Sequence, residues 1–244
     1  MKNLIYTTAV NMDGRDVDDN SILSVTKKTW DYWCKKNNID FYVIDEKIVE
    51  DTSPHWFRYH IMNIKPNYDR YLYIDSDIMV KWDSPNIFDV FKDRTKLYAV
   101  RDNAGLAWIW EGINAYKEFF PDVDLEWDNY FNSGVLLFSK HHQDLFDSFI
   151  KFYLDNRDKI NHFQKNVKKG YDQTPFNYFT TKHNIDKEFI TDRWNLNHMI
   201  RKEILNPGYF IKMGNFWHFN GFPREQQYGI LKQIWESVEE MYNE

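Results

Sequence analysis

The chain of 244 residues has a single cysteine, Cys34, and no long apolar run. One thiol excludes an intrachain disulfide, and it excludes zinc sites built from several cysteines. No segment approaches the roughly 18 apolar residues of a membrane-spanning helix. Residues 1–10 are too short and too polar for a secretory signal peptide. We therefore expect a cytoplasmic protein without a membrane span.

Concentrated positive charge is also missing from the chain. The formal net charge is −6, and Lys and Arg do not gather into a basic stripe. Because nucleic-acid phosphates are bound by concentrated positive charge, we expect no nucleic-acid partner. Aromatic residues are abundant instead, at 18% of the chain with 10 Trp. Large aromatics usually fill cores, but they also stack on sugar rings, so their number favours a carbohydrate ligand without requiring one.

No internal repeat, low-complexity tract or linker rich in Pro, Gly and Ser interrupts the chain, so we expect a single domain over residues 1–244. The first half alternates predicted strands at 3–10, 40–45, 68–75 and 96–102 with predicted helices at 21–36 and 52–64. The second half is less regular, with a predicted strand at 130–140 and predicted helices near 144–159, 172–182 and 225–242. This alternation predicts an α/β fold with a Rossmann-like, mostly parallel central sheet flanked by helices.

Two aspartates, Asp75 and Asp77, close the strongest strand pattern, YLYIDSDIMV at 71–80. Two positions apart in an extended segment, their side chains leave on the same side. Neighbouring carboxylates repel each other, and a divalent cation removes that conflict. Hard oxygen ligands suit Mg²⁺ or Mn²⁺. The alternative is a solvated strand end with the aspartates as caps, because Asp-x-Asp is common by chance.

Two classes of metal-dependent enzyme place Asp-x-Asp after a hydrophobic strand. Haloacid-dehalogenase-type phosphatases use the first Asp as nucleophile, usually near the N-terminus, with Thr or Val two residues after the second. Here the motif begins at Asp75 and Met79 stands in that place. Nucleotide-sugar glycosyltransferases are the other class. The phosphatase stays open as an alternative, as does a non-catalytic protein that binds nucleotide sugars.

Further motifs accompany the Asp-x-Asp segment in order along the chain. They are TTAVN at 7–11, Arg58, AVRD at 99–102, YFNSGVLLF at 130–138, YDQTPFNYF at 171–179 and HFNGFPRE at 218–225. The ordered set resembles glycosyltransferase family 8, the group of glycogenin, bacterial lipopolysaccharide glucosyl- and galactosyltransferases and galactinol synthases. The resemblance runs through nearly the whole chain. It implies the GT-A fold.

The resemblance implies a site for a metal ion and a diphosphate. Asp75, Asp77 and His218 would hold Mn²⁺ or Mg²⁺ against the diphosphate. Taken alone, His218 is more simply explained as a histidine packed among aromatic neighbours. Gly221 would let the backbone approach a phosphate closely. Arg224 stands where the family has Lys, which keeps the positive charge and leaves the phosphate contact less secure.

The base, ribose and diphosphate of the donor would have further partners. By resemblance, Thr8, Ala9 and Asn11 would touch the base and ribose. Arg58 would lie close to the diphosphate or a sugar hydroxyl, and the alternative for it is a surface arginine on a helix.

The sugar would be held by residues of several motifs. Asp102 and Asn132 would contact it, and the small Ser133 beside Asn132 suits a backbone that passes next to a ligand. Asp102 could equally end a strand in a turn. Asp172 and Gln173 would line the reacting face as catalytic residues, although Asp172 could equally be a helix N-cap.

The implied activity is retaining transfer of a hexose, from UDP-glucose or UDP-galactose, to a hydroxyl of a glycan, lipid-linked or protein acceptor. Residues 1–102 would form the nucleotide-binding half, and residues 103–244 the sugar and acceptor half. Trp108, Trp110 and Trp127 fall in a loop-like insertion, where core packing is favoured over an acceptor wall or lid. Whether the protein forms a homodimer stays open.

Overall fold

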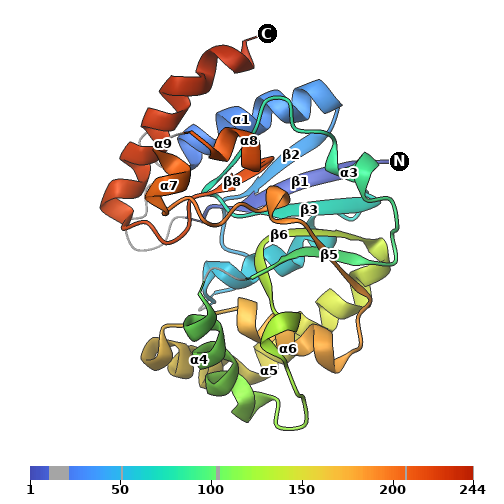
Figure 1. Cartoon of the computed structure of the whole chain (residues 1–244). Helices are drawn as coiled ribbons and strands as arrows, with labels where there is room; N and C mark the ends of the chain where they lie inside the picture. Colours follow the sequence, from blue (N-terminus) through green and yellow to red (C-terminus); the bar gives the residue numbers. More distant parts are fainter. Residues whose placement is uncertain (11–21, 51, 103–104, 207, 244) are drawn as a thin grey trace.

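A central six-stranded sheet lies between two helical layers in the computed structural model (Figure 1). The structure describes the chain except residues 11–21, 51, 103–104, 207 and 244. The strands of this sheet are β1 (Asn3–Thr8), β2 (Asp40–Ile44), β3 (Arg70–Ile74), β5 (Leu97–Arg101), β6 (Phe131–Ser139) and β7 (Lys187–Ile190). Their order is β2-β1-β3-β6-β5-β7.

One strand of the sheet, β6, runs opposite to the others. It pairs antiparallel with both β3 and β5, whereas β1 is parallel to β2 and β3, and β5 is parallel to β7. The predicted mostly parallel α/β sheet is therefore confirmed. The reversal of β6 has a functional consequence, because it brings the start of β6 to the edge where β1, β3 and β5 end.

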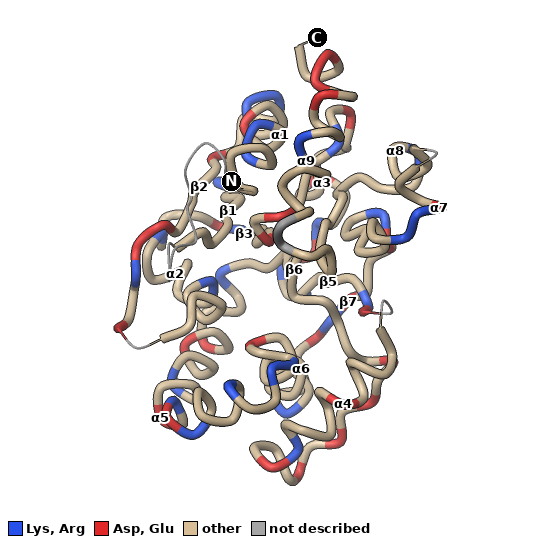
Figure 2. The backbone as a smooth tube through the Cα atoms, turned by 90° about the vertical axis from the view of Figure 1, so that its left-hand side faces the viewer, with Lys and Arg blue, Asp and Glu red and all other residues tan. Residues whose placement is uncertain are grey.

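Both faces of the sheet are covered, which explains the near-continuous apolar runs of its central strands. On β3, Tyr71 and Tyr73 belong to the core on one face, and Leu72 and Ile74 belong to the core on the other. Helices α1 (Ile22–Asn37) and α9 (Arg224–Val238) lie on one side of the sheet. Helices α5 (Gln143–Val167) and α6 (Gln173–Lys182) lie on the other. Figure 2 shows basic and acidic residues interspersed over these helices.

A second, two-stranded sheet adjoins the end of β3. Strand β4 (Ile78–Val80) pairs antiparallel with β8 (Phe216–His218), and Ile78 lies opposite His218. The same side of the molecule carries the short helices α7 (Lys202–Leu205) and α8 (Phe210–Met213). The sequence did not predict β4, β7 or β8. Three or four residues give too short a pattern for a strand to be distinguished from a loop.

Several predicted helices differ in extent from the observed ones. The segment 52–64 is a 3₁₀ helix, η1 (Pro54–His60), followed by α2 (Ile61–Ile64). Pro54 begins it, and the Ser53 side chain forms no capping hydrogen bond. Helix α5 continues well beyond residue 159 to Val167, and a short α3 (Ile87–Val90) follows β4. None of the described helices is long and apolar enough to cross a membrane.

The insertion after β5 was predicted as a loop, and this prediction was wrong. Residues Leu106–Tyr116 form helix α4, which buries a stripe made by Ile109, Gly112, Ile113 and Tyr116. The stripe has helical spacing, but the tryptophans between its members conceal the amphipathic pattern.

His142 makes the stability of this fold depend on pH. Its side chain is buried, and burial lowers the pKa of His142 to about 4. Between about pH 6.5 and 4 the unfolded chain therefore takes up a proton that the folded chain refuses, so stability is lost as the pH falls. We expect the free energy of unfolding to fall by about 3 kcal/mol more in the wild type than in His142→Gln between pH 7 and 4. Urea unfolding at both pH values measures it, with His162→Gln on the exposed face of α5 as the control. Equal pH dependence of the wild type and His142→Gln would contradict the assignment.

Candidate active site

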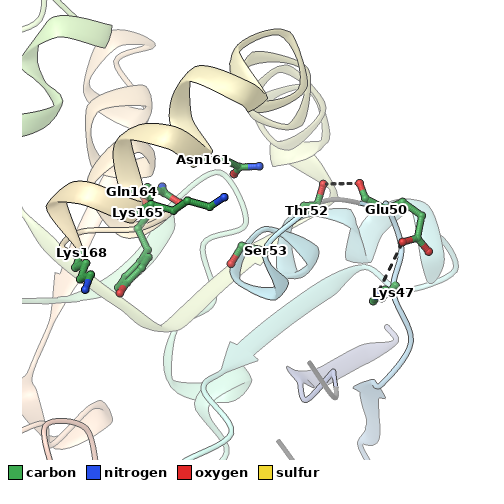
Figure 3. A pocket seen from close by; sticks show the side chains of 9 residues that line it. Lys47, Glu50, Thr52, Ser53, Asn161, Gln164, Lys165 and Lys168 are labelled. Atoms are coloured by element: carbon green, nitrogen blue, oxygen red, sulfur yellow. Dashed lines mark hydrogen bonds and ion pairs between the residues drawn. The ribbon is translucent and has the colours of Figure 1, made fainter. Parts of the chain in front are cut away.

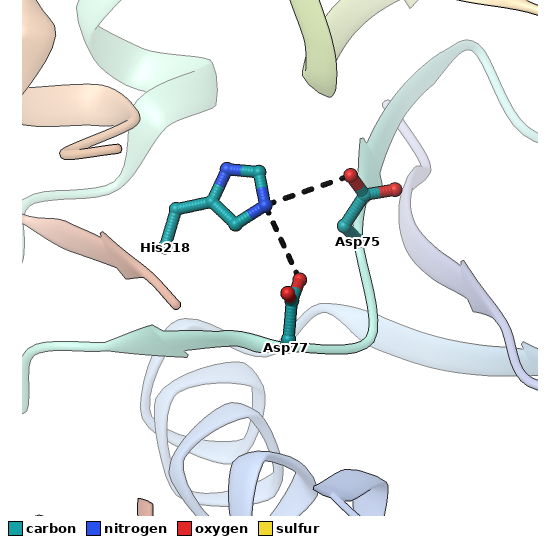
Figure 4. A group of neighbouring side chains, drawn as sticks. All are labelled: Asp75, Asp77 and His218. Carbon is teal, nitrogen blue, oxygen red and sulfur yellow. Dashed lines mark ion pairs between the residues drawn. The ribbon is translucent and has the colours of Figure 1, made fainter. Parts of the chain in front are cut away.

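Three side chains able to bind a metal ion meet where β3 ends (Figure 4). Asp75 directly follows β3, Asp77 directly precedes β4, and His218 is the last residue of β8. The distance from His218 Nε2 to Asp75 Oδ2 is 3.6 Å, and to Asp77 Oδ1 it is 3.2 Å. Pairing of β4 with β8 thus brings together residues that are far apart in the sequence.

The geometry of this cluster fits a six-coordinate divalent cation. With bonds of roughly 2.1 Å, adjacent ligands of an octahedral ion lie about 3 Å apart. The two distances above are close to that value. Two carboxylates are the ligands that Mn²⁺ and Mg²⁺ prefer, and imidazole is more typical of transition metals. The donor set therefore suits Mn²⁺ well.

His218 is oriented for this role by a neighbouring amide. Asn195 uses its Nδ2 to donate to Asn132 Oδ1 at 2.9 Å, so its Oδ1 is the acceptor for His218 Nδ1 at 2.8 Å. In the neutral imidazole the proton is then on Nδ1, which leaves Nε2, on the side of the two carboxylates, as the atom that could bind a metal ion. Burial alone would lower the pKa of His218, but Asp77 and then Asp75 raise it above its usual value. The carboxylates thus attract positive charge to this point, and packing among aromatic neighbours alone does not describe His218.

Arg58 connects the cluster to Asp172 from inside the protein. Its side chain is 5% exposed; its Nε lies 3.2 Å from Asp172 Oδ2, and its Nη1 lies 3.4 Å from Asp75 Oδ1. A surface arginine is therefore the wrong description. Burial disfavours the charge of Arg58, yet Asp172, Tyr73 and Asp75 together raise its pKa above the usual value. Its contact with a diphosphate or sugar stays a prediction.

Asp172 does not cap its helix with its side chain. It stands at the N-cap position of α6, as the alternative had it, but its side chain forms no capping hydrogen bond. Instead, Oδ2 accepts a hydrogen bond from the Tyr59 hydroxyl at 2.8 Å in addition to the ion pair with Arg58. The carboxylate is thereby fixed beside the metal cluster.

The predicted sugar-binding residues form one hydrogen-bonded group. Gln173 Nε2 donates to Asp102 Oδ2 at 3.0 Å, and Gln173 Oε1 accepts from the Ser133 backbone N–H at 2.9 Å. Asn132 Nδ2 donates to the same oxygen of Asp102 at 3.4 Å. The reversal of β6 brings Asn132 and Ser133 to the end of β5, where Asp102 lies. Their contacts with a sugar stay predictions.

The remaining predicted residues have no described contact with this group, or lie outside the described part of the chain. Thr8 ends β1, and the mostly buried Ala9 follows it at the same sheet edge. Gly221 has φ +80°, a left-handed conformation that favours glycine. Asn11 and the side chain of Arg224 lie outside the described residues.

Sequence reasoning missed the residues that hold the side chains of this candidate metal site in place. Besides Asn195, Gln227 on α9 donates to Asp77 Oδ2 at 2.9 Å, and the Tyr73 hydroxyl donates to Asp75 Oδ1 at 2.7 Å. A buried amide has no sequence signal that separates it from an ordinary polar residue. Tyr73 could have been found from the sequence, because it lies two positions before Asp75 in an extended segment and its side chain therefore points to the same side as that of Asp75.

The three tryptophans of the insertion are not part of the core, contrary to the favoured prediction. Trp108 and Trp110 lie on α4 and Trp127 on a 3₁₀ turn, with exposed fractions of 36%, 56% and 46%. Helix α4 packs on α6 through Gly112, where an added Cβ would lie 3.0 Å from Thr174 Oγ1. The acceptor wall or lid stays a prediction.

A methyl group at Gly134 would disturb the metal cluster. Its Cβ would lie 2.6 Å from His218 Cε1 and 2.8 Å from both Asp75 Oδ2 and Asn132 Oδ1. We therefore expect Gly134→Ala to weaken Mn²⁺ binding about 10–100-fold, the usual effect of disturbing the support of metal ligands. Titration with Mn²⁺ followed by electron paramagnetic resonance measures it. Gly229→Ala is the control, because its Cβ meets nothing within 4 Å. Equal Mn²⁺ affinity in both variants would show that this cluster does not bind the metal.

Residues 51–223 match the family model described as Glycosyl transferase family 8. The chain belongs to glycosyltransferase family 8. No curated protein matches it.

Solved glycosyltransferases share its fold at low sequence identity. A glycosyltransferase involved in glycosylation of the major capsid of PBCV-1 aligns with a TM-score of 0.61 and 14% identity, over 96% of this chain and all of its own. The galactosyltransferase LgtC, solved with donor and acceptor sugar analogs, aligns with a TM-score of 0.58 and 16% identity, over 96% of this chain and 99% of its own. The bifunctional WbbM aligns with a TM-score of 0.60 and 15% identity over 99% of this chain. The aligned region covers 51% of WbbM. The predicted family and GT-A fold are therefore confirmed.

Proposed function

We propose that this family 8 protein is a metal-dependent retaining glycosyltransferase that transfers a hexose from UDP-glucose or UDP-galactose to an acceptor hydroxyl. One observation carries the proposal. The cluster of Asp75, Asp77 and His218 and the pair Asp172 and Gln173 lie side by side, and Arg58 contacts both groups. A metal site directly beside a set of polar sugar-binding side chains suits a substrate with a diphosphate next to a sugar. A haloacid-dehalogenase-type phosphatase belongs to another family, and nothing in the fold favours it.

In the proposed reaction, Asp75, Asp77 and His218 would hold Mn²⁺, or less favourably Mg²⁺, whose charge would neutralise the leaving diphosphate. Asp172 and Asp102 would accept hydrogen bonds from sugar hydroxyls, and Gln173 would lie at the reacting face. The Asp172 carboxylate is already held by Arg58 and Tyr59, which makes it a poor nucleophile. We therefore favour attack of the acceptor on the face that the diphosphate leaves, with a phosphate oxygen taking the acceptor proton. Such attack retains the configuration at the sugar.

The rest of the donor and the acceptor would be bound by residues on either side of the candidate metal site. Residues 1–244 would act as one domain, with Thr8, Ala9 and Asn11 against the nucleotide, and Gly221 and Arg224 against the diphosphate. Asn132 and Ser133 would contact the hexose. The acceptor would be a glycan, a lipid-linked sugar or a protein.

A screen of donors by thermal shift tests the proposal. UDP-, GDP- and dTDP-sugars are added to the purified protein with and without Mn²⁺. A donor present at 100 times its Kd stabilises the fold by about 2.7 kcal/mol, which raises the Tm by about 5–10 °C. We expect this shift for a UDP-hexose and only with Mn²⁺. No change in Tm with any donor, or a change in Tm that is the same with and without Mn²⁺, would overturn the proposal.

Retention is tested separately, by proton NMR of the hexose that the enzyme releases when water replaces the acceptor. Front-face attack on an α-linked donor releases the α-anomer first, before it equilibrates with the β-anomer. Initial release of the β-anomer would show inversion and exclude the proposed mechanism.

A further inference from the structure

A pocket separate from the metal cluster lies between the C-terminal end of α5 and the segment that joins β2 to η1 (Figure 3). Its volume is about 660 Å³, which is enough for a small ligand. Three lysines line it, Lys47, Lys165 and Lys168, together with one described carboxylate, Glu50. This excess of positive charge contrasts with the net charge of −6 of the whole chain.

Two of these lysines are available to a ligand. Lys47 Nζ lies 3.7 Å from Glu50 Oε2, whereas Lys165 and Lys168 form no ion pair with any carboxylate that the structure describes. Figure 3 shows Lys165 extending from α5 toward Ser53, which lines the opposite side of the pocket. Two ammonium groups that pair with none of the described carboxylates, together with a nearby hydroxyl, suit a carboxylate or a phosphate.

The pocket and the candidate active site share one wall. Tyr171 lines the pocket and directly precedes Asp172, and its ring stacks on His55 with centroids 5.2 Å apart. Gln164 on α5 fixes the wall, because its Nε2 donates to the Tyr171 backbone oxygen at 2.8 Å and to the Tyr116 hydroxyl at 2.9 Å. A ligand in the pocket would therefore lie against the residue that directly precedes Asp172.

We propose that this pocket binds the acidic group, a carboxylate or a phosphate, of a sugar acceptor. The inference rests on the proposed transferase function. In the proposed function, a metal ion held by Asp75, Asp77 and His218 would bind the diphosphate of the donor, which leaves a second anion site for the acceptor. Tyr171, with an exposed fraction of 39%, adds an aromatic surface for a sugar ring.

Titration calorimetry with small acceptor probes, without donor or metal, tests the proposal. The probes are methyl β-glucuronide for the carboxylate, glucose 6-phosphate for the phosphate, methyl β-glucoside as the neutral sugar and inorganic phosphate as the bare anion. We expect at least one acidic sugar to bind about tenfold or more tightly than both the neutral sugar and the bare anion. The double variant Lys165→Gln/Lys168→Gln should lose this preference, and raising the salt concentration should weaken it.

Lys151→Gln is the matched control, because Lys151 lies on α5 outside the pocket and pairs with Asp155. It should bind the probes as the wild type does. Equal binding of acidic and neutral sugars, full retention in the double variant, or inorganic phosphate binding as tightly as the acidic sugars would each overturn the proposal. These titrations use no donor, so their outcome does not depend on the outcome of the donor screen. A wild type that binds UDP-hexose but no acidic sugar would refute the pocket alone.

Discussion

Asp75→Asn should lower the rate of metal-dependent sugar transfer by about 10³-fold or more, since a metal at the leaving group contributes several kcal/mol to the transition state. The substitution keeps the size of the side chain but removes one of the two negative charges that would hold the metal. It also removes the carboxylate that lies 3.6 Å from His218 Nε2 and 3.4 Å from Arg58 Nη1. Release of UDP from UDP-galactose and UDP-glucose, measured at several Mn²⁺ concentrations, gives the effect.

The control for this variant is Asp83→Asn, in the segment that follows β4. Asp83 is exposed and pairs with Lys81 at 2.9 Å, so its loss should change neither Mn²⁺ affinity nor turnover. His218→Ala should resemble Asp75→Asn, because both remove a ligand of the same ion. Full turnover and unchanged Mn²⁺ affinity in Asp75→Asn would show that the metal, if used, is bound elsewhere.

The parts of the site that the sequence predicted well are those with a local pattern. The strand before Asp75 is buried over its whole length because both faces of the sheet are covered, and its end marks the sheet edge. The same logic located Asp102 at the end of β5. The motifs that resemble family 8 then predicted the other residues, and the structure places Asn132, Ser133, Asp172 and Gln173 around Asp102 or Arg58.

What the sequence did not predict depends on pairing between distant segments. The pattern of YFNSGVLLF is the same for a parallel and an antiparallel strand, so the reversal of β6 was invisible. Yet this reversal brings Asn132 to the edge of the sheet where β3 and β5 end, because the start of an antiparallel strand lies beside the ends of its neighbours. Pairing of β4 with β8 likewise gives His218 its position, and three residues carry no pattern that predicts it.

Arg58 shows the same limit for a charged side chain. In sequence it is one arginine among aromatic residues in a short helix, and its burial depends on Asp172, 114 positions later. Local periodicity cannot separate such a residue from an arginine on the surface. Only the tertiary contact shows that its charge is needed inside the protein.

Arg58→Met should therefore destabilise the protein strongly, by about 3–5 kcal/mol in the free energy of unfolding, because removing one partner leaves buried charges uncompensated. Asp172 is 2% exposed, and among the described residues it would keep the hydrogen bond from Tyr59 as its one compensating contact. Arg58→Lys should lose less stability than Arg58→Met, because lysine keeps the positive charge. It should still be less stable than the wild type, because lysine lacks the guanidinium group that reaches both carboxylates. Arg201→Met, which breaks an exposed pair with Glu203, should cost less than about 1 kcal/mol.

The pH dependence of the stability lost in Arg58→Met shows whether the loss comes from the missing charge or from missing packing contacts. Burial raises the pKa of Asp75, and Arg58 is the first of the groups that outweigh burial and hold that pKa below its usual value. In Arg58→Met the pKa of Asp75 should therefore rise, and the folded variant should take up a proton that the unfolded chain does not. The deficit relative to the wild type should then be largest near pH 7 and shrink as the pH falls toward 5. Urea unfolding in EDTA at these two pH values measures it, and a deficit independent of pH would mean that Arg58 stabilises the site by packing alone.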